Sequence, residues 1–440
     1  MSDINRIGII GAGSMGTELS LLFAENNIYT SLFDVNTENV DKALERAKKE
    51  NLDKFLTGFK DYENFIKSFP EGKLRLLLFS ITHGSPVDQV LDSLIPLMKK
   101  YENETIIIDG GNEWYIDTEK RQERIKKEFG EKVKYIGMGV SGGYQSARRG
   151  PSISPGGEKI AYDRIEGFLK KFAAKSKSGE PCVTYIGPGG AGHYVKMVHN
   201  GIEQGMLSIT IETYGILKTT LGLSNDKIGD IFAKWVNEGE LKGNFLYQIC
   251  SEICKRKTED GKGFVLDDIE DKVTQDVDDS EGTGVWTVVE AATRHVPCPT
   301  ISEAHFLRLI SSDRPQRRQF GKNTDIPKPR KAQNVNVEEW IETLRKASYG
   351  AFLACFVQGC NLIAVMSKQK KWHIKMSEVM KIYRAGCIIQ SEYIIDMLYS
   401  IFAKAEKEND EPIHINTTEV FCNEINKTTK SLKQVFFCVY

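Results

Sequence analysis

The sequence predicts an α/β domain with a mostly parallel sheet, followed by a large all-helical domain. Residues 6–188 alternate short apolar strands with helical stretches, which is typical of strands joined by crossover helices. After Gly190 the alternation stops, and long helical runs without strands follow. The turn Gly187-Pro188-Gly189-Gly190 separates the two patterns. We therefore predict one domain over residues 1–188 and a second over residues 189–440.

Residues 6–34 form the first unit of the α/β domain. An apolar strand ends at Ile10, a glycine-rich turn follows, a helix is predicted from Thr17 to Asn26, and a second strand runs to Asp34. The turn reads G-x-G-x-x-G in the setting of a Rossmann dinucleotide-binding domain. Its glycines permit a tight turn, a close approach to a pyrophosphate and close packing of helix on strand. The residues expected to contact the cofactor are Gly11, Gly13, Met15 and Gly16.

Asp34 lies at the end of the second strand, where ribose is recognised in such domains. A carboxylate there accepts hydrogen bonds from ribose hydroxyls and repels a 2′-phosphate. Val35 supplies no charge to offset that repulsion. Taken alone, this pair favours NAD over NADP.

Further loops follow the later strands of the sheet. Strands are predicted at 73–80, 104–109, 133–137 and 182–187, with a turn at 155–157. The loops 110–114 and 139–143 follow two of them, at the edge where a doubly wound sheet binds ligands. We expect Asn112 in the first loop, and Ser141, Gly142 and Gly143 in the second, to contact substrate or nicotinamide. The alternative is that these loops are ordinary turns.

Lys196, His199, Asn200 and Glu203 have the spacing i, i+3, i+4 and i+7 on a helix predicted over 191–218. Such residues share one helix face. An amine, an imidazole, an amide and a carboxylate together suit the binding of a polyhydroxy acid and proton transfer. The alternative is a solvated polar stripe, and spacing alone does not separate the two. The dinucleotide pattern upstream favours the binding face.

The rest of the second domain carries fewer signals. Helices are predicted at 225–256, 285–312, 337–367 and 376–406. The basic stretch 314–331 is interpreted as a solvated connector in preference to a phosphate site. His305 lies three residues before Arg308 and its role is left open.

Composition excludes several classes of function. The chain has 440 residues, 40% of them hydrophobic, 27% charged, and a net charge of -1, so no affinity for nucleic acid or anionic membranes is expected. We expect no membrane span, because no apolar run approaches the length that one requires. The nine cysteines include no CxxC pair, and no signal peptide is recognised, which predicts reduced thiols in the cytoplasm and no metal site.

Several motifs together resemble the 6-phosphogluconate dehydrogenase family over nearly the whole chain, to about residue 400. The wider class of β-hydroxyacid dehydrogenases shares only the glycine fingerprint and shorter versions of two elements. The motifs that carry the resemblance are Gly11 to Gly16, Asp109 to Trp114, Gly137 to Gly143, Lys196 to Glu203, Gly282 to Trp286 and Arg384 to Ile389.

The resemblance implies a Rossmann domain, a helical domain and a homodimer. It implies oxidative decarboxylation of 6-phospho-D-gluconate to ribulose 5-phosphate with NADP, in the pentose phosphate pathway. Lys196 would be the general base and Glu203 the general acid, and a lysine beside a cationic nicotinamide has its pKa lowered. Arg308 matches the family's phosphate arginine. The residues that would hold the sugar acid are Asn112, Ser141, Gly142, Gly143, His199 and Asn200, and Asn112 would also contact the cofactor.

The sequence departs from the family where anions are bound. The family has Asn-Arg in place of Asp34-Val35, and that arginine contacts the 2′-phosphate. The family also has tyrosine in place of Gln204 and lysine in place of Glu281, at the substrate phosphate. Its C-terminal tail, which carries an arginine and a histidine into the partner's site, has no counterpart before Tyr440. Further departures from the family are Thr82, Tyr144 and Gln390. The cations that could replace the lost phosphate ligands are Arg148, Arg149 and Lys322.

Three functions follow from this pattern. The first is a 6-phosphogluconate dehydrogenase that has diverged, and the length of the motif match places it ahead. The second is an NAD-dependent dehydrogenase of an unphosphorylated sugar acid, favoured by Asp34, Gln204 and Glu281. The third is a catalytically degenerate subunit, against which the retained face of Lys196 to Glu203 argues.

Overall fold

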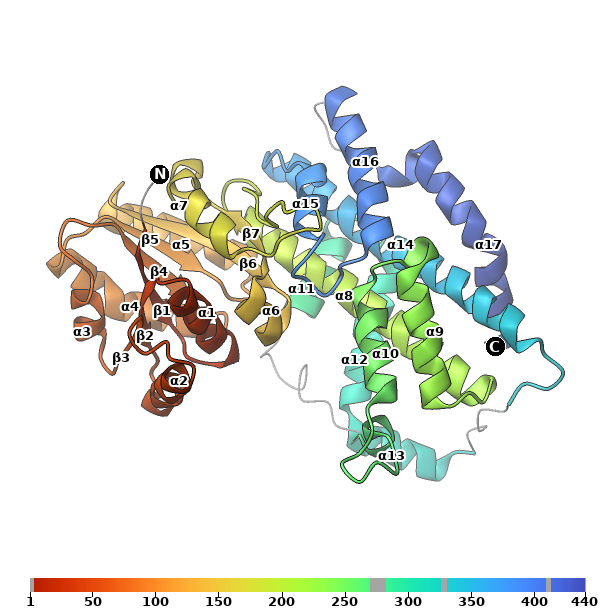
Figure 1. The fold of residues 1–440 in the computed structure, drawn as a ribbon. Coiled ribbons are helices and arrows are strands. Elements are labelled where there is room, and N and C mark those ends of the chain that lie inside the picture. Colours follow the sequence, from red (N-terminus) through yellow and green to blue (C-terminus); the bar gives the residue numbers. More distant parts are fainter. Residues whose placement is uncertain (1–3, 270–281, 326–330, 409–412, 440) are drawn as a thin grey trace. The chain divides into compact units, whose positions relative to one another are not determined.

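The computed structural model describes residues 4–269, 282–325, 331–408 and 413–439 (Figure 1). The chain divides into two compact units. The first contains Met1–Met197 and Ser367–Cys387, and the second contains Val198–Met366 and Ile388–Tyr440. The predicted boundary at residue 188 lies before helix α8 (Ala191–Gly215), whose first turns pack within the first unit.

The first unit is built on a seven-stranded sheet with the order β3-β2-β1-β4-β5-β6-β7. The neighbouring pairs from β3 to β6 are parallel, and β7 runs antiparallel to β6. This arrangement confirms the predicted α/β fold. The strands are β1 (Arg6–Ile10), β2 (Tyr29–Phe33), β3 (Leu56–Phe59), β4 (Arg75–Phe79), β5 (Thr105–Asp109), β6 (Val133–Ser141) and β7 (Ser152–Gly156).

Helices cover both faces of this sheet, because successive strand side chains point to opposite faces. In β4, Leu76 and Leu78 pack into one core with α1, α2 and α7, whereas Leu77 and Phe79 pack into another with α3, α4 and α5. The helices of the first unit are α1 (Ser14–Glu25), α2 (Thr37–Lys49), α3 (Tyr62–Lys67), α4 (Ser85–Lys100), α5 (Tyr115–Phe129), α6 (Gly143–Arg149), α7 (Lys159–Phe172) and α15 (Met376–Ile382).

Three strand predictions need correction. Residues 155 and 156 of the predicted turn 155–157 belong to β7, where Pro155 pairs with Met138 of β6. Proline is tolerated there because β7 is the last strand of the sheet. Its outer side forms isolated hydrogen bonds, such as those from the Ile153 amide to Cys182 and from the Gly157 amide to Gly187, in place of a full ladder. Strand β6 continues to Ser141, so part of the predicted loop 139–143 is strand. Residues 182–187 form only the isolated bridges Ile153–Val183 and Gly156–Gly187.

The second unit is helical, as predicted. Its helices are the rest of α8, α9 (Asn225–Asn237), α10 (Phe245–Lys255), α11 (Thr283–Thr293), α12 (Pro299–Ser312), α13 (Arg314–Asn323), α14 (Val337–Lys370), α16 (Glu392–Glu408) and α17 (Glu419–Val439), with the short turns η1 (Ile216–Thr220), η2 (Gly239–Leu241), η3 (Val265–Asp268) and η4 (Ile415–Thr417).

Three of the long helices predicted there are each two helices. Gly239 and Gly243 have positive φ angles of 70° and 68° and separate α9 from α10. His295 has a φ of 56°, ahead of two prolines, between α11 and α12, and Gly386 has a φ of 72° between α15 and α16. A left-handed residue ends a helix because its backbone cannot continue the hydrogen-bonding pattern. The basic stretch predicted as a connector contains helix α13.

Helix α14 is long and apolar enough to cross a membrane by length and composition, which corrects the expectation that no run approaches that length. Its apolar window has a mean hydropathy of 1.7, and 72% of that window is buried inside the structure. Burial of this kind is typical of the core helix of a globular domain.

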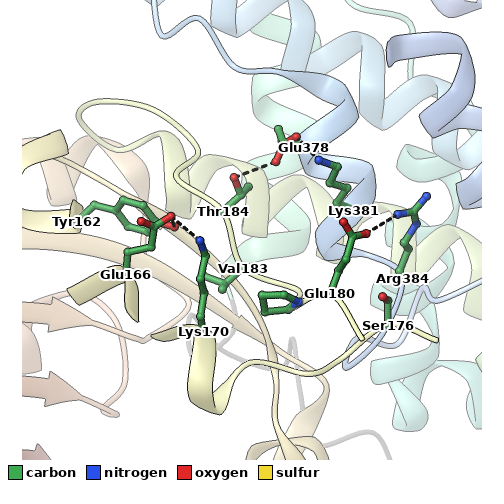
Figure 2. A pocket seen from close by; sticks show the side chains of 11 residues that line it. Tyr162, Glu166, Lys170, Ser176, Glu180, Val183, Thr184, Glu378, Lys381 and Arg384 are labelled. Atoms are coloured by element: carbon green, nitrogen blue, oxygen red, sulfur yellow. Dashed lines mark hydrogen bonds and ion pairs between the residues drawn. The ribbon is translucent and has the colours of Figure 1, made fainter. Parts of the chain in front are cut away.

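Residues 367–387 belong to the first unit because they hydrogen-bond to its edge strand. The Ser152 hydroxyl donates to the Ile382 carbonyl at 2.6 Å, and the Gly386 carbonyl accepts from the Ser152 amide at 2.9 Å. A pocket of about 330 Å³ lies beside them, lined by α7, residues 176–184 and α15 (Figure 2). Its cations pair with carboxylates within the pocket, as in Lys381 with Glu378 at 2.6 Å. This pocket joins elements of the first unit and contains none of the predicted site residues.

Candidate active site

The glycine-rich turn has the geometry that a dinucleotide requires. Gly11 has a φ of 104°, and a side chain there would collide with the Ser80 carbonyl. A side chain on Gly16 would collide with the Gly11 carbonyl, so α1 lies close against the turn. By contrast, a Cβ on Gly13 meets nothing within 4 Å. In the described part of the chain no side chain caps α1, which leaves its first amides for a pyrophosphate.

Asp34 and Met15 occupy different environments beside this turn. The Asp34 carboxylate accepts from the Ala12 amide at 2.6 Å and from the Asn36 amide at 2.8 Å. It therefore holds the glycine turn and the start of α2 together, a role that sequence spacing did not suggest. Met15 is half-buried and packs against the core between α1 and the sheet. Its predicted contact with the cofactor stays a prediction.

The loop after β5 is fixed by a buried ion pair. Asn112 is half-buried, and its neighbour Glu113 is 2% exposed. The Glu113 carboxylate accepts from Arg121 at 2.5 Å and from the Gly84 amide at 2.9 Å. Burial lowers the pKa of Arg121, but hydrogen bonds to Asp88 and the charge of Glu113 outweigh it and raise that pKa. Glu113 and Arg121 therefore fix the loop at Gly84 against the loop 110–114 that carries Asn112.

We expect the change Arg121→Gln to lower the free energy of unfolding by about 3–5 kcal/mol, because it leaves the buried Glu113 carboxylate without its cation. Urea denaturation would measure the change. The matched control is Arg124→Gln, which breaks the exposed pair with Asp92 and should cost about 0–1 kcal/mol. Equal losses in the two variants would contradict this account.

Lys196 and Ser141 meet in the first unit. The Lys196 ammonium donates to the Ser141 hydroxyl at 2.8 Å, and the two residues are 8% and 4% exposed. A side chain on Gly139 would collide with Lys196, so the bare strand β6 gives the lysine room to extend toward Ser141. Gly142 and Gly143 follow with positive φ angles of 99° and 63° and end the strand. This hydrogen bond joins the predicted loop 139–143 to the predicted helix that carries Lys196.

His199, Asn200 and Glu203 lie on α8 within the second unit. The His199 ring is 1% exposed, and its Nδ1 lies 3.0 Å from the Asn200 side-chain oxygen and 3.9 Å from the Glu203 carboxylate. The Asn200 amide donates to the Thr283 hydroxyl at 3.2 Å. Thr283 begins α11 in the motif 282–286, so α8 and that motif form one polar cluster.

Gln204, which stands where the family has a tyrosine at the substrate phosphate, follows Glu203 on α8. A side chain on Gly284 would meet Gln204 and His305, so these three residues from α8, α11 and α12 lie together. Arg308 follows His305 by one helical turn and lies on the same side of α12. Glu281 lies outside the described residues, and the side chain of Tyr144 is not described.

The candidate replacement cations differ in their surroundings. Arg148 is occupied by Glu25 and by Glu50, the latter at 2.9 Å, so it holds α6 against α1 and α2 and is wrong as a phosphate ligand. Arg149 and Lys322 are exposed. The predicted set missed His193, which is 1% exposed and bonds Thr118 at 2.7 Å and the Asp109 carbonyl at 3.0 Å. It fixes α8 to the sheet, and its spacing three residues before Lys196 was the available signal.

Comparison with known proteins identifies both halves of the chain. Residues 6–187 match the family model for the NAD binding domain of 6-phosphogluconate dehydrogenase, and residues 192–439 match the C-terminal domain of 6-phosphogluconate dehydrogenase.

Relatives match over most of their length. The decarboxylating 6-phosphogluconate dehydrogenase of Emericella nidulans is 44% identical over 435 residues, which cover 96% of this chain and 86% of that protein. The NADP(+)-dependent, decarboxylating enzyme of Bacillus subtilis is 37% identical over 88% of this chain and 78% of its own. The solved Plasmodium falciparum enzyme, studied with its cofactor NADP+ and its substrate 6-phosphogluconate, has a TM-score of 0.85 and 33% identity, covering 98% of this chain and 88% of that one.

Proposed function

The chain belongs to the 6-phosphogluconate dehydrogenase family, and from that premise we propose that it oxidises and decarboxylates 6-phospho-D-gluconate to ribulose 5-phosphate with reduction of NADP. It is an oxidoreductase acting on a CH–OH group. The observation that carries the proposal is the hydrogen bond of 2.8 Å between Lys196 and Ser141. It holds a buried amine on the same helix face as His199, Asn200 and Glu203.

The residues of the glycine turn fit NADP. The open space at Gly13 and the first amides of α1 suit its pyrophosphate. Relatives that are named or solved with NADP support that cofactor over NAD. When bound, NADP+ accepts the hydride from C3 of the substrate. The relatives therefore do not support the preference for NAD that Asp34 and Val35 suggested. In the structure the Asp34 carboxylate has another role, because it accepts hydrogen bonds from two backbone amides.

The two proposed proton transfers are assigned to one helix. The Lys196 amine takes the proton from the C3 hydroxyl as hydride leaves the same carbon, which gives a β-keto acid. The bond from C2 to the carboxylate then breaks and carbon dioxide leaves. The electron pair of that bond moves through C2–C3 to the C3 oxygen, which takes a proton back from Lys196 and gives an enediol. Glu203 protonates the carbon that carried the carboxylate while Lys196 accepts the proton of the C3 hydroxyl, so the ketose forms. The side chains proposed to hold the sugar acid are those of Asn112, Ser141, His199, Asn200 and, at the phosphate, Arg308, with the loop at Gly142 and Gly143.

The test is a turnover assay on the purified chain that follows absorbance of the reduced cofactor. It combines NADP or NAD with 6-phosphogluconate or gluconate. Turnover with NADP and 6-phosphogluconate is the expected result. Turnover only with NAD or with gluconate would replace the proposal by the second function that the sequence suggested. A folded chain that binds NADP but turns over no pair would indicate a degenerate subunit.

We also propose a cytoplasmic homodimer. The cysteines that the structure describes are all free thiols, which suits a reducing compartment. Large apolar side chains are exposed at helical spacing on neighbouring helices of the second unit, with Val289 of α11 47% exposed and Phe306 and Ile310 of α12 50% and 60% exposed. Apolar rows of this kind favour contact with a second copy of the chain.

The double change Phe306→Glu and Ile310→Glu should produce a monomer, because charges cannot be buried in such a contact without a partner. Light scattering during size-exclusion chromatography should give twice the chain mass of 49.6 kDa for the wild type and that mass for the variant. Ile160→Glu, at a 63% exposed position on α7 in the first unit, is the control and should leave the mass doubled. A dimeric double variant would rule out this face.

A further inference from the structure

The glycine turn borders a hollow that is lined on one side by polar and basic residues of α2, and none of these belongs to the motifs of the family. The hollow has a volume of about 450 Å³ and lies between the glycine turn with the start of α1 and one face of α2. Gly13, Ser14 and Thr17 form one side. Asn39, Lys42 and Arg46 form the other, at the spacing i, i+3 and i+7 of a single helix face.

Arg46 is already held within the protein. Its guanidinium donates to both oxygens of Glu18, at 2.5 and 3.1 Å, and to Glu50 at 2.9 Å. The hydrogen bond to Glu18 raises the pKa of Arg46. Its charge is therefore balanced by carboxylates that are nearer than any ligand in the hollow.

Lys42 is differently placed. Its side chain is 74% exposed, and the ion pair described for it, with Glu38 on the preceding turn, has a long distance of 4.0 Å. Glu38 is itself 78% exposed, and an exposed helical pair of this kind holds a lysine only weakly. Lys42 can therefore turn toward an anion in the hollow at little cost.

Asp34 ties the glycine turn to the start of α2 beside this hollow. Its carboxylate bonds the Ala12 amide in the glycine turn and the Asn36 amide just before α2. A cofactor whose pyrophosphate lies on the glycine turn has its ribose at the end of β2, with α2 as its neighbour. The amide side chain of Asn39 and the ammonium of Lys42 are the donors that this face of α2 offers to a substituent on the ribose.

We propose that Lys42, assisted by Asn39, binds the 2′-phosphate of NADP. Lys42 thus takes over the role of the arginine that the family has at the position of Val35. The proposal rests on the proposed use of NADP. Lys42 is a specificity-determining residue in this account. The Lys42 ammonium is a point charge on a long, flexible side chain. It can therefore reach a phosphate near the start of α2 from its position beyond the first turn of that helix.

The experiment measures equilibrium binding of two fragments, 2′,5′-ADP and 5′-AMP, by calorimetry, so it needs no turnover. The wild type should bind 2′,5′-ADP more tightly than 5′-AMP. Lys42→Gln should weaken 2′,5′-ADP by about 10-fold to 100-fold and leave 5′-AMP unchanged. Glu38→Gln, which removes a competing carboxylate, should strengthen 2′,5′-ADP, and the effect of both variants should shrink as salt is added.

Lys49→Gln is the matched control. It removes the same charge from the same helix, seven residues and about 10 Å further along, outside the hollow. It should leave both dissociation constants unchanged. If the wild type does not prefer 2′,5′-ADP, the proposed use of NADP fails. If the preference exists and Lys42→Gln keeps it, or Lys49→Gln weakens binding equally, only the role of Lys42 is overturned.

Discussion

Replacing Lys196 with methionine should lower kcat for 6-phosphogluconate by about 10²-fold to 10⁴-fold, the range expected when a general base is removed. Methionine is similar in length and unbranched, so it can follow the path along Gly139 that the lysine takes. The amine that would accept the C3 hydroxyl proton is lost. Steady-state turnover, followed by absorbance of the reduced cofactor, would measure the loss.

Two further variants separate chemistry from structure. Lys171→Met removes an exposed lysine from α7 and should leave kcat unchanged. Ser141→Ala keeps the amine but removes its partner at 2.8 Å, so it should give a smaller loss together with a shifted pH–rate profile. Binding of NADP should be the same in all three variants. A Lys196→Met enzyme with more than a tenth of wild-type kcat would show that another group is the base.

The fold was predictable because its signals are local. Buried strands such as Leu76 to Phe79 are continuous apolar runs, and the glycine turn stands between a strand and a helix in the sequence. The helix that carries Lys196 and Glu203 was predicted from the same kind of periodicity and is α8. These features depend on neighbours within a few turns of the chain.

The predictions that were wrong concern features that depend on residues far away in the sequence or on the backbone angles of single residues. Pro155 is compatible with a strand only because β7 is the last strand of the sheet, which the sequence around it does not state. The sequence suggests Arg148 as a replacement phosphate ligand, but Glu25 in α1 and Glu50 at the end of α2 form ion pairs with it. The long helices broke at His295 and Gly386, where a positive φ interrupts an otherwise helical pattern.

The candidate site was predictable in its residue types but not in its supports. Spacing grouped His199 with Asn200 and Glu203, and the structure keeps them together. The link from Asn200 to Thr283 spans 83 residues, and that from Lys196 to Ser141 spans 55. Nothing in the local sequence specifies such pairs. They arise when α8 packs on β6 and, in the second unit, on α11.

Replacing Glu203 with glutamine should lower kcat by about 10²-fold to 10⁴-fold while KM for 6-phosphogluconate changes little. Glutamine keeps the size of the side chain near His199, whose Nδ1 lies 3.9 Å from the carboxylate. It cannot deliver a proton to the enediol carbon. In the proposed mechanism Glu203 takes no part in oxidation or in the loss of carbon dioxide, so the defect should fall on the last step of the reaction.

Turnover in heavy water distinguishes this role from a structural one. The wild-type enzyme should place deuterium at C1 of ribulose 5-phosphate with one configuration, because a fixed acid delivers it to one face of the enediol. The slow Glu203→Gln reaction should give both configurations, because solvent then protonates the released enediol. Glu212→Gln is the control, since residue 212 lies nine positions along α8 and faces the opposite side. A single configuration from Glu203→Gln would assign the final proton to another residue.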